Sequence, residues 1–170
     1  MCGDSAGGNL VLTTAYKAIE ENIRVPDALL LAYPAVDLTK DTITPSRVMY
    51  INDVLVPYHA LLLCHDSYFA VETHSKTKYH LCSPLYAPDQ LLLKLPSLIT
   101  IMTAGLDPLA DDGLKLVRRL ENLGKKVEHF HYRGVPHGFL NFGQVISMAS
   151  DAKNKACEVL QEMIRKLEEN

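Results

Sequence analysis

The spacing of apolar residues predicts three amphipathic helices in this chain. They span residues 6–22, 112–123 and 145–168. The inward-facing positions are Leu12, Ala15 and Ile19 in the first segment, Leu116, Leu120 and Leu123 in the second, and Ala149, Ala152, Ala156, Val159, Met163 and Leu167 in the third. Gly124 directly follows the second segment and is expected to act as its C-cap.

Strands are predicted between these helices, at residues 28–36, 98–106 and 126–133. The first two are continuous apolar runs, which are typical of strands buried on both faces of a sheet. Strands that alternate with helices indicate a mostly parallel sheet covered by helices. The predicted fold class is therefore α/β.

The segment 37–96 separates the first two predicted strands and is too long for an ordinary connection. One short helical stretch is predicted within it, near residues 58–71. The segment also contains Pro45, Pro57, Pro84, Pro88 and Pro96. We interpret it as a functional insertion, such as a cover over a site. A boundary between separate domains is the alternative, but the flanking strands have the character of a single sheet.

Composition and charge exclude several classes of function. The 170 residues are 48% hydrophobic and 22% charged, which is typical of a globular protein. A net charge of -3 offers no basic surface for nucleic acid or for anionic lipid. No apolar run reaches the roughly 18–20 residues that span a bilayer, and no signal peptide is visible at the N-terminus. A cytoplasmic protein without a transmembrane segment is expected.

The four cysteines are scattered, and we interpret them as free thiols in a reducing compartment. They are Cys2, Cys64, Cys82 and Cys157. A disulfide or a zinc site is the alternative, with Cys64-His65 and His80-x-Cys82 as conceivable ligands. Their spacing matches no common zinc pattern, so no metal and no cofactor are predicted.

A serine flanked by glycines near the N-terminus carries the clearest chemical signal. Gly3-Asp4-Ser5-Ala6-Gly7 matches G-x-S-x-G, in which the serine projects from a sharp strand-to-helix turn. The predicted helix follows directly, but only Met1 and Cys2 precede the motif, so we expect the preceding strand to be almost absent. We predict Ser5 as a nucleophile and the amide of Ala6 as an oxyanion donor. A plain glycine-rich turn is the alternative.

An acid and a base are expected later in the chain, in the order Ser, Asp, His. Asp107 directly follows the second predicted strand, and Pro108 disfavours helical geometry there, so the carboxylate stays at the end of that strand. His137 lies in a loop after the third strand. His129 and His131 are competitors, but they lie inside that strand and are expected to be half-exposed. We predict that His137 activates the serine and that Asp107 orients the imidazole, for hydrolysis of a carboxylic ester.

Residues 3–9 read G-D-S-A-G-G-N, and the sequence resembles the hormone-sensitive lipase family of α/β-hydrolases. The other segments that carry the resemblance are Val25-Pro26-Asp27, Ala32-Tyr33-Pro34-Ala35, Pro45-Ser46-Arg47, Ser83-Pro84-Leu85, Ala87-Pro88-Asp89, Gly105-Leu106-Asp107-Pro108-Leu109, Asp111-Asp112, Arg118-Arg119-Leu120, Leu123-Gly124 and Pro136-His137-Gly138-Phe139-Leu140. The resemblance implies that residues 1–170 are the C-terminal part of a catalytic domain. It also implies a neutral lipase for acylglycerols or related lipid esters, in the cytoplasm or at lipid droplets.

This chain departs from the family pattern at the oxyanion motif. The family places H-G-G-G upstream of the serine, and residues 1–170 hold no counterpart. We therefore expect these residues alone to be inactive, and to be unstable because strand 28–36 would form an unpaired apolar edge. The apolar residues expected to line an acyl pocket, or else to pack inside a cap, are Val48, Met49, Tyr50, Ile51, Val54, Leu55 and Val56.

Three alternatives to a lipase remain open at this point. A small-ester carboxylesterase of the same fold would use the same three residues on a shorter acyl chain. A hydrolase-fold protein could instead bind a small ligand without catalysis, although such a binder has no need of all three residues. The last alternative is a truncated product without activity.

Overall fold

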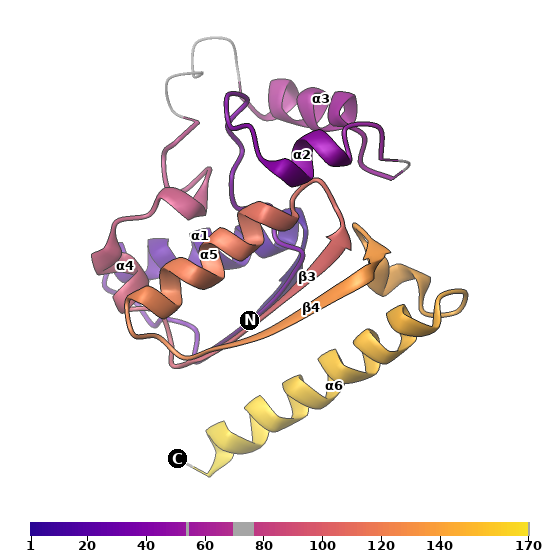
Figure 1. Ribbon diagram of the computed structural model, residues 1–170. Helices are drawn as coiled ribbons and strands as arrows, with labels where there is room; N and C mark the ends of the chain where they lie inside the picture. The colour runs from indigo at the N-terminus through magenta and orange to yellow at the C-terminus, as the bar shows by residue number, and fades with distance from the viewer. Residues whose placement is uncertain (54, 70–76, 170) are drawn as a thin grey trace.

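The computed structural model describes residues 1–53, 55–69 and 77–169, and its centre is a parallel sheet (Figure 1). The strands of this sheet, in spatial order, are β1 (Cys2–Asp4), β2 (Ala28–Ala32), β3 (Leu98–Leu106) and β4 (Val127–Pro136). Each neighbouring pair is parallel, so the carboxyl ends of all these strands meet at one edge of the sheet. The predicted α/β class with a mostly parallel sheet is confirmed.

Helices cover the two faces of the sheet. The long ones are α1 (Ala6–Glu20), α5 (Ala110–Asn122) and α6 (Ser147–Glu168). Helix α6 lies on the face away from α1 and α5 (Figure 1). The three predicted amphipathic helices are confirmed, and Gly124 follows α5 with a φ of 79°. Leu167 was wrongly assigned to the inward face, since its side chain is 42% exposed in the last turn of α6.

Several short helices occupy the segment that was expected to be an insertion. They are α2 (Pro45–Met49), α3 (Tyr58–Tyr68), η2 (Pro84–Tyr86) and α4 (Asp89–Leu93); η3 (Phe139–Phe142) follows β4. The predicted helix near 58–71 corresponds to α3, and its end overlaps residues that lie outside the described part of the chain. Helices α2 and α3 lie beyond the carboxyl ends of the strands (Figure 1). Neither α2 nor α4 completes two turns, which explains why periodicity did not reveal them.

Strand β2 is shorter than predicted, because residues 33–36 leave the sheet. Tyr33 has a φ of 35°, and its backbone N–H donates to the carbonyl of Met102 at 2.6 Å. This left-handed residue turns the chain at the end of the strand, yet Tyr33 and Val36 remain buried. The apolar run therefore predicted burial correctly for residues 28–36, but it predicted the strand correctly only as far as Ala32.

The prediction of an unpaired apolar edge at β2 was wrong, because β1 covers it. The register places Cys2 opposite Leu30, Gly3 opposite Leu31 and Asp4 opposite Ala32. The N-terminal ammonium of Met1 extends this pairing by donating to the carbonyl of Ala28 at 2.7 Å. Two residues before the motif are thus enough to begin the strand that was expected to be almost absent.

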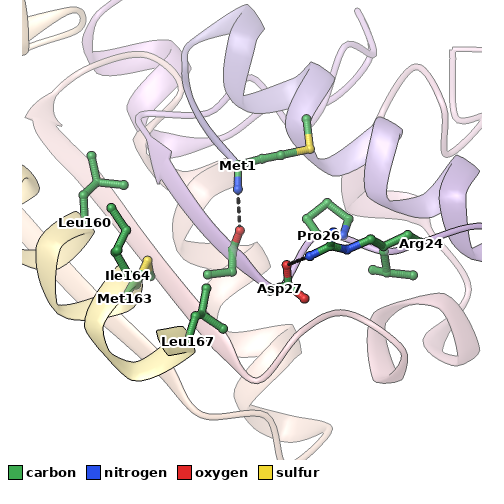
Figure 2. A pocket seen from close by; sticks show the side chains of 10 residues that line it. Met1, Arg24, Pro26, Asp27, Leu160, Met163, Ile164 and Leu167 are labelled. Atoms are coloured by element: carbon green, nitrogen blue, oxygen red, sulfur yellow. Dashed lines mark hydrogen bonds and ion pairs between the residues drawn. The ribbon is translucent and has the colours of Figure 1, made fainter. Parts of the chain in front are cut away.

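A cavity of about 370 Å³ lies between the start of β1 and the last turns of α6 (Figure 2). Met1 and residues 24–28 face Leu160, Met163 and Leu167 across it. Arg24 and Asp27, which form an ion pair 2.8 Å long, are among the lining residues. Ser5, Asp107 and His137 do not line this cavity, so it is separate from the residues that the motif analysis selected.

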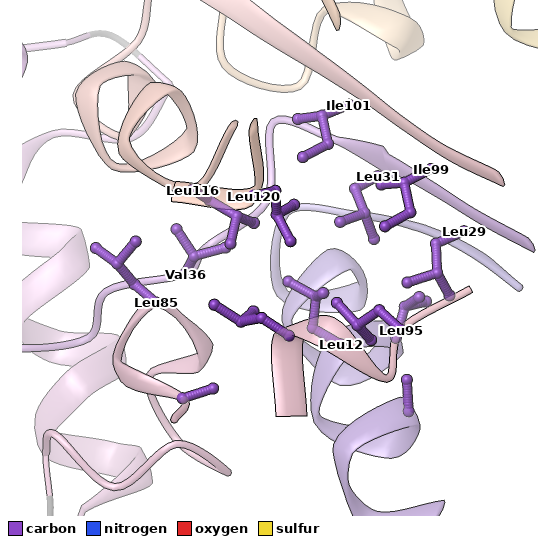
Figure 3. Close-up of a cluster of buried hydrophobic side chains, with 14 of the residues drawn as sticks. Leu12, Leu29, Leu31, Val36, Leu85, Leu95, Ile99, Ile101, Leu116 and Leu120 are labelled. Atoms are coloured by element: carbon purple, nitrogen blue, oxygen red, sulfur yellow. The ribbon is translucent and has the colours of Figure 1, made fainter. Parts of the chain in front are cut away.

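The main hydrophobic core fills the space between the sheet and the helices α1 and α5 (Figure 3). Leu12 of α1 and Leu116 of α5 meet Leu31 of β2 and Ile101 of β3, and all four side chains are fully buried. Adjacent strands contribute alternate residues to this layer, which fixes the register of the sheet. This core holds β2 and β3 in place below the edge where the strands end.

We expect Leu31→Ala to lower the free energy of unfolding of the full-length protein by about 2–5 kcal/mol, because it leaves a cavity in this core. Chemical denaturation measures the loss. Leu93→Ala is the matched control, since Leu93 is 52% exposed on α4 and its truncation should cost about 0.5 kcal/mol or less. Equal losses in the two variants would contradict this account of the core.

Candidate active site

Ser5 occupies a sharp turn between β1 and α1. Its φ of 53° and ψ of -119° are unusual for a residue with a side chain. The backbone N–H of Ser5 donates to the carbonyl of Ala32 at 2.9 Å, and its carbonyl accepts from Ala35 at 3.0 Å. The end of β2 and the turn that follows it therefore hold the serine in this strained conformation.

The glycines around Ser5 allow β1 and α1 to approach closely. A Cβ atom at Gly3 would lie 2.4 Å from the carbonyl oxygen of Gly7, and one at Gly8 would lie 2.7 Å from the Cβ of Pro34. Both distances are too short for non-bonded atoms. A Cβ at Gly7 itself would meet nothing closer than 3.9 Å. The close approach thus requires glycine at positions 3 and 8, and leaves room at position 7.

Asp107 is the first residue after β3 and is 1% exposed. Its Oδ1 accepts a hydrogen bond from the backbone N–H of Leu109 at 2.7 Å. Its Oδ2 lies 2.9 Å from Nδ1 of His137. One oxygen of the carboxylate is therefore held by its own loop, and the other faces the histidine.

His137 is the first residue after β4, and an irregularity near the end of that strand directs it towards Ser5. The register changes between Ala104, which pairs with Tyr132, and Leu106, which pairs with Pro136. Strand β4 thus uses more residues than β3 over this stretch, as in a β-bulge, and such irregularities re-aim the side chains that follow. His137 is 6% exposed at the end of the altered strand.

The three side chains selected from the sequence form one chain of hydrogen bonds. Nε2 of His137 lies 2.8 Å from Oγ of Ser5, and Nδ1 of the same ring lies 2.9 Å from Oδ2 of Asp107. Each ring nitrogen therefore has a partner that suits a neutral imidazole with its proton on Nδ1. In that state the ring can accept the serine proton, and the carboxylate can stabilise the imidazolium that forms.

Ala6 is the first residue of α1. The first amides of a helix have no partner within the helix, and they carry the positive end of its dipole. The predicted oxyanion donor thus belongs to a group of amides that can bind a developing negative charge beside Ser5.

Two residues near the site were missed by the motif analysis. The ring of Tyr33 packs edge-on against His137, with ring centroids 5.0 Å apart, and burial followed by the charge of Asp4 raises the pKa of its phenol. Asn9 donates from Nδ2 to the carbonyls of Ala35 at 2.7 Å and Cys82 at 2.8 Å. The G-D-S-A-G-G-N signature contained Asn9 and the Ala32-Tyr33-Pro34-Ala35 segment contained Tyr33, but neither segment indicated the role of that residue.

An apolar cavity of about 550 Å³ opens beside the hydrogen-bonded chain. Ser5 and His137 line one part of it, and α3 supplies Leu61 and Leu62 to another. Of the insertion residues expected at an acyl pocket, Leu55 and Val56 do line this cavity. Val48, Met49 and Ile51 are instead exposed on the surface, Tyr50 is not among the lining residues, and Val54 lies outside the described residues.

The competing histidines lie elsewhere on β4. His129 is partly buried and His131 is exposed, as expected for strand residues. Nε2 of His129 and Nδ1 of His131 each lie 2.9 Å from Oγ1 of Thr103 rather than near Ser5. In the described parts of the chain, no three His, Cys, Asp or Glu side chains are grouped as a metal site would require, and Cys2, Cys64 and Cys157 carry free thiols.

The comparison with protein families decides the assignment of the fold. The model for the family described as the alpha/beta hydrolase fold matches residues 1–141. The chain belongs to the α/β-hydrolase family. Within this family, the resemblance to hormone-sensitive lipases is confirmed by the protein from Bos taurus, which is 42% identical over 73 residues.

Other α/β-hydrolases match over nearly all of the chain. The carboxylic ester hydrolase LipN of Mycobacterium tuberculosis is 31% identical over 163 residues. The esterase of Pyrobaculum calidifontis superposes on 93% of the chain with a TM-score of 0.83 and 32% identity. The chain spans 10% of the bovine lipase, 42% of LipN and 50% of the Pyrobaculum esterase. The similarity is thus to a part of each of these hydrolases.

We expect Gly3→Ala to destabilise the turn around Ser5, since the new Cβ would collide with the backbone of Gly7. The full-length α/β-hydrolase should lose about 1–3 kcal/mol of stability, measured as a lower midpoint of thermal unfolding. Gly7→Ala is the control, because the space at that position accepts a methyl group and the midpoint should stay within about 2 °C. The account of the turn fails if both variants unfold alike.

Proposed function

We propose that the protein hydrolyses carboxylic esters, with Ser5 as nucleophile, His137 as general base and Asp107 as the acid of the triad. The observation that carries this proposal is the continuous hydrogen-bonded chain from Ser5 Oγ through the imidazole to the carboxylate. The names of the relatives support it, since they describe a lipase, an esterase and a carboxylic ester hydrolase.

The mechanism follows from the positions of these atoms. Oγ of Ser5 attacks the ester carbonyl carbon while Nε2 of His137 takes the hydroxyl proton. The carbonyl π electrons move onto oxygen, and the amide of Ala6 donates to that oxyanion. The tetrahedral intermediate then collapses and expels the alcohol, which receives the proton from His137. Water repeats the sequence on the acyl-serine, so that the acid is released and Ser5 is restored.

The described residues supply Ala6 as one oxyanion donor, whereas acyl-transfer sites on this fold use a second amide from another loop. Removing one donor from such a site costs about 10²–10³ in turnover. We therefore propose that residues 1–170 alone are at best weakly active, and that activity requires the full-length protein.

We further propose that the substrate is a lipid ester, such as an acylglycerol. The 550 Å³ cavity beside Ser5 has a mostly apolar lining, which suits an acyl chain better than a polar group. On this proposal the segment 37–96 covers the site, because α3 forms one wall of the cavity. The similarity to hormone-sensitive lipases supports a lipid substrate and, with it, contact with lipid droplets in the cytoplasm.

A small ester is the second candidate substrate, since two relatives that match over nearly the whole chain have names that mention ester hydrolysis but no lipid. LipN is described as a carboxylic ester hydrolase and the Pyrobaculum protein as an esterase. Acyl-chain length distinguishes the two candidates.

None of the described helices is long and apolar enough to cross a membrane.

A fluorophosphonate probe should label the protein at Ser5, because the probe reacts with serines that a neighbouring imidazole activates. Ser5→Ala should abolish the labelling. Asp107→Asn should reduce the turnover of p-nitrophenyl butyrate by about 10⁴-fold, since it leaves the imidazole without its carboxylate. Mass spectrometry of the labelled peptide identifies the serine. Labelling that persists in Ser5→Ala would refute the assignment of the nucleophile.

Replacing Leu61 by tryptophan should shorten the acyl chain that the cavity accepts. Leu61→Trp is expected to lower kcat/KM for p-nitrophenyl decanoate about tenfold more than for p-nitrophenyl acetate, within the range that pocket shape commonly controls. Leu63→Trp is the control, because Leu63 is 68% exposed on the same helix and does not line the cavity. A wild type that prefers acetate, with no chain-length effect of Leu61→Trp, would favour the small-ester candidate.

A further inference from the structure

The peptide group between Pro108 and Leu109 is hydrogen-bonded to both Asp107 and Ser46. The backbone N–H of Leu109 donates to Oδ1 of Asp107 at 2.7 Å. The carbonyl of Pro108, which belongs to the same peptide group, accepts from Oγ of Ser46 at 2.9 Å. This peptide group is therefore anchored at both ends, to the carboxylate on one side and to the serine on the other.

Because a peptide group is planar, its N–H and C=O cannot turn independently. Oγ of Ser46 fixes the direction of the Pro108 carbonyl, and so fixes the direction in which the Leu109 N–H points. That N–H holds Oδ1 of Asp107, and its position determines where Oδ2 lies relative to His137. We propose that Ser46 is a positioning residue for Asp107, acting through the peptide between Pro108 and Leu109.

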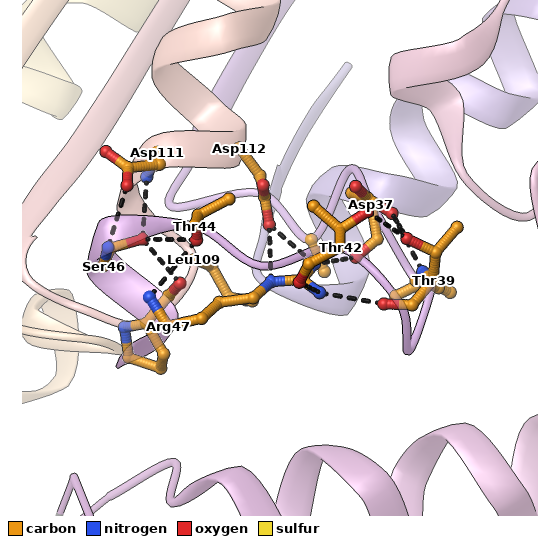
Figure 4. A network of polar contacts seen from close by, with 12 residues as sticks. Asp37, Thr39, Thr42, Thr44, Ser46, Arg47, Leu109, Asp111 and Asp112 are labelled. Carbon is orange, nitrogen blue, oxygen red and sulfur yellow. Dashed lines mark hydrogen bonds and ion pairs between the residues drawn. The ribbon is translucent and has the colours of Figure 1, made fainter. Parts of the chain in front are cut away.

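Further hydrogen bonds place Ser46 against the first turn of α5, which follows the loop that carries Asp107 (Figure 4). Its backbone N–H donates to Oδ2 of Asp111 at 2.8 Å, and the N–H of Asp111 donates to Oγ of Ser46 at 3.3 Å. Oγ1 of Thr44 lies 3.2 Å from the same Oγ. The serine is only 7% exposed, so water does not readily replace these contacts.

Arg47, the next residue of α2, attaches this helix to α5. Arg47 donates from Nε and Nη2 to Oδ2 of Asp112, at 3.2 and 2.8 Å. Figure 4 shows this pair beside the contacts between Ser46 and Asp111. Asp112 is fully buried in the first turn of α5, and charged pairs of this kind keep a fixed geometry. Helix α2 is thus held at the start of α5, close to the peptide group that Ser46 contacts.

This role differs from a part in substrate binding. Ser46 does not line the cavity beside Ser5, whereas Leu109 and His137 do. Loss of its hydroxyl should therefore disturb the geometry of the carboxylate and leave substrate affinity intact. The inference rests on the proposed function for its effect on turnover, but the hydrogen bond between Asp107 and His137 can be observed without any reaction.

The test compares Ser46→Ala with Ser46→Thr and Ser67→Ala in the full-length protein. Ser67 is an exposed serine on α3 and serves as the control, and threonine restores the hydroxyl. Proton NMR follows the low-field signal of the His137 Nδ1–H, which is identified by its absence in His137→Gln. Steady-state kinetics on p-nitrophenyl butyrate give kcat and KM, and thermal unfolding reports the fold.

We expect the low-field signal to shift or broaden in Ser46→Ala, and to remain as in the wild type in Ser67→Ala. The value of kcat should fall roughly tenfold in Ser46→Ala with KM within about twofold, as a small misplacement of a catalytic group predicts. Ser46→Thr should recover most of the signal and of kcat. An unchanged signal in a folded Ser46→Ala overturns the inference, and so does a fall in thermal stability alone. If the wild type shows no esterase activity, the proposed function fails, and the NMR comparison still decides the role of Ser46.

Discussion

Parallel pairing of the strands is the constraint on which the candidate site depends. Ser5 directly follows the carboxyl end of β1, Asp107 that of β3 and His137 that of β4. Because neighbouring strands run in the same direction, these ends meet at one edge of the sheet. Ser5 and His137 are 132 positions apart in the chain and 2.8 Å apart in space. An antiparallel β4 would move His137 to the opposite edge of the sheet, away from Ser5.

Much of this arrangement could be predicted from the residues. Long helices bury one stripe of side chains, so α1, α5 and α6 were visible as periodic patterns. Strand β3 was visible as a run bounded by Asp107 and Pro108, and the motif around Ser5 marked a turn between a strand and a helix. The residues of the proposed triad were then selected by chain order and by their position after strands. The helical patterns belong to elements long enough to repeat them, and the apolar run and the motif are local signals.

Other features depend on contacts between distant segments and left no local signal. The end of β2 is set by the left-handed Tyr33 and its bond to Met102, whereas the apolar run continues through Val36. The change of register between β3 and β4, which aims His137, arises from pairing rather than from composition. The contact between Ser46 and Pro108 joins residues 62 positions apart. A single sequence shows whether such residues are polar or apolar, but it does not show which distant residues they contact.

Arg47 limits how the sequence of residues 37–44 can change. Its guanidinium donates to the backbone carbonyls of Asp37, Thr39 and Thr42 as well as to Asp112. A stretch without regular secondary structure is thereby folded around one side chain, whose planar fork a lysine cannot reproduce. The bonds to this stretch end on backbone carbonyls, so they do not depend on its side chains, although Asp37, Thr39 and Thr42 also form side-chain hydrogen bonds of their own. The exposed positions of this loop, such as Asp41 and Ile43, can therefore drift in sequence while the loop stays attached through Arg47.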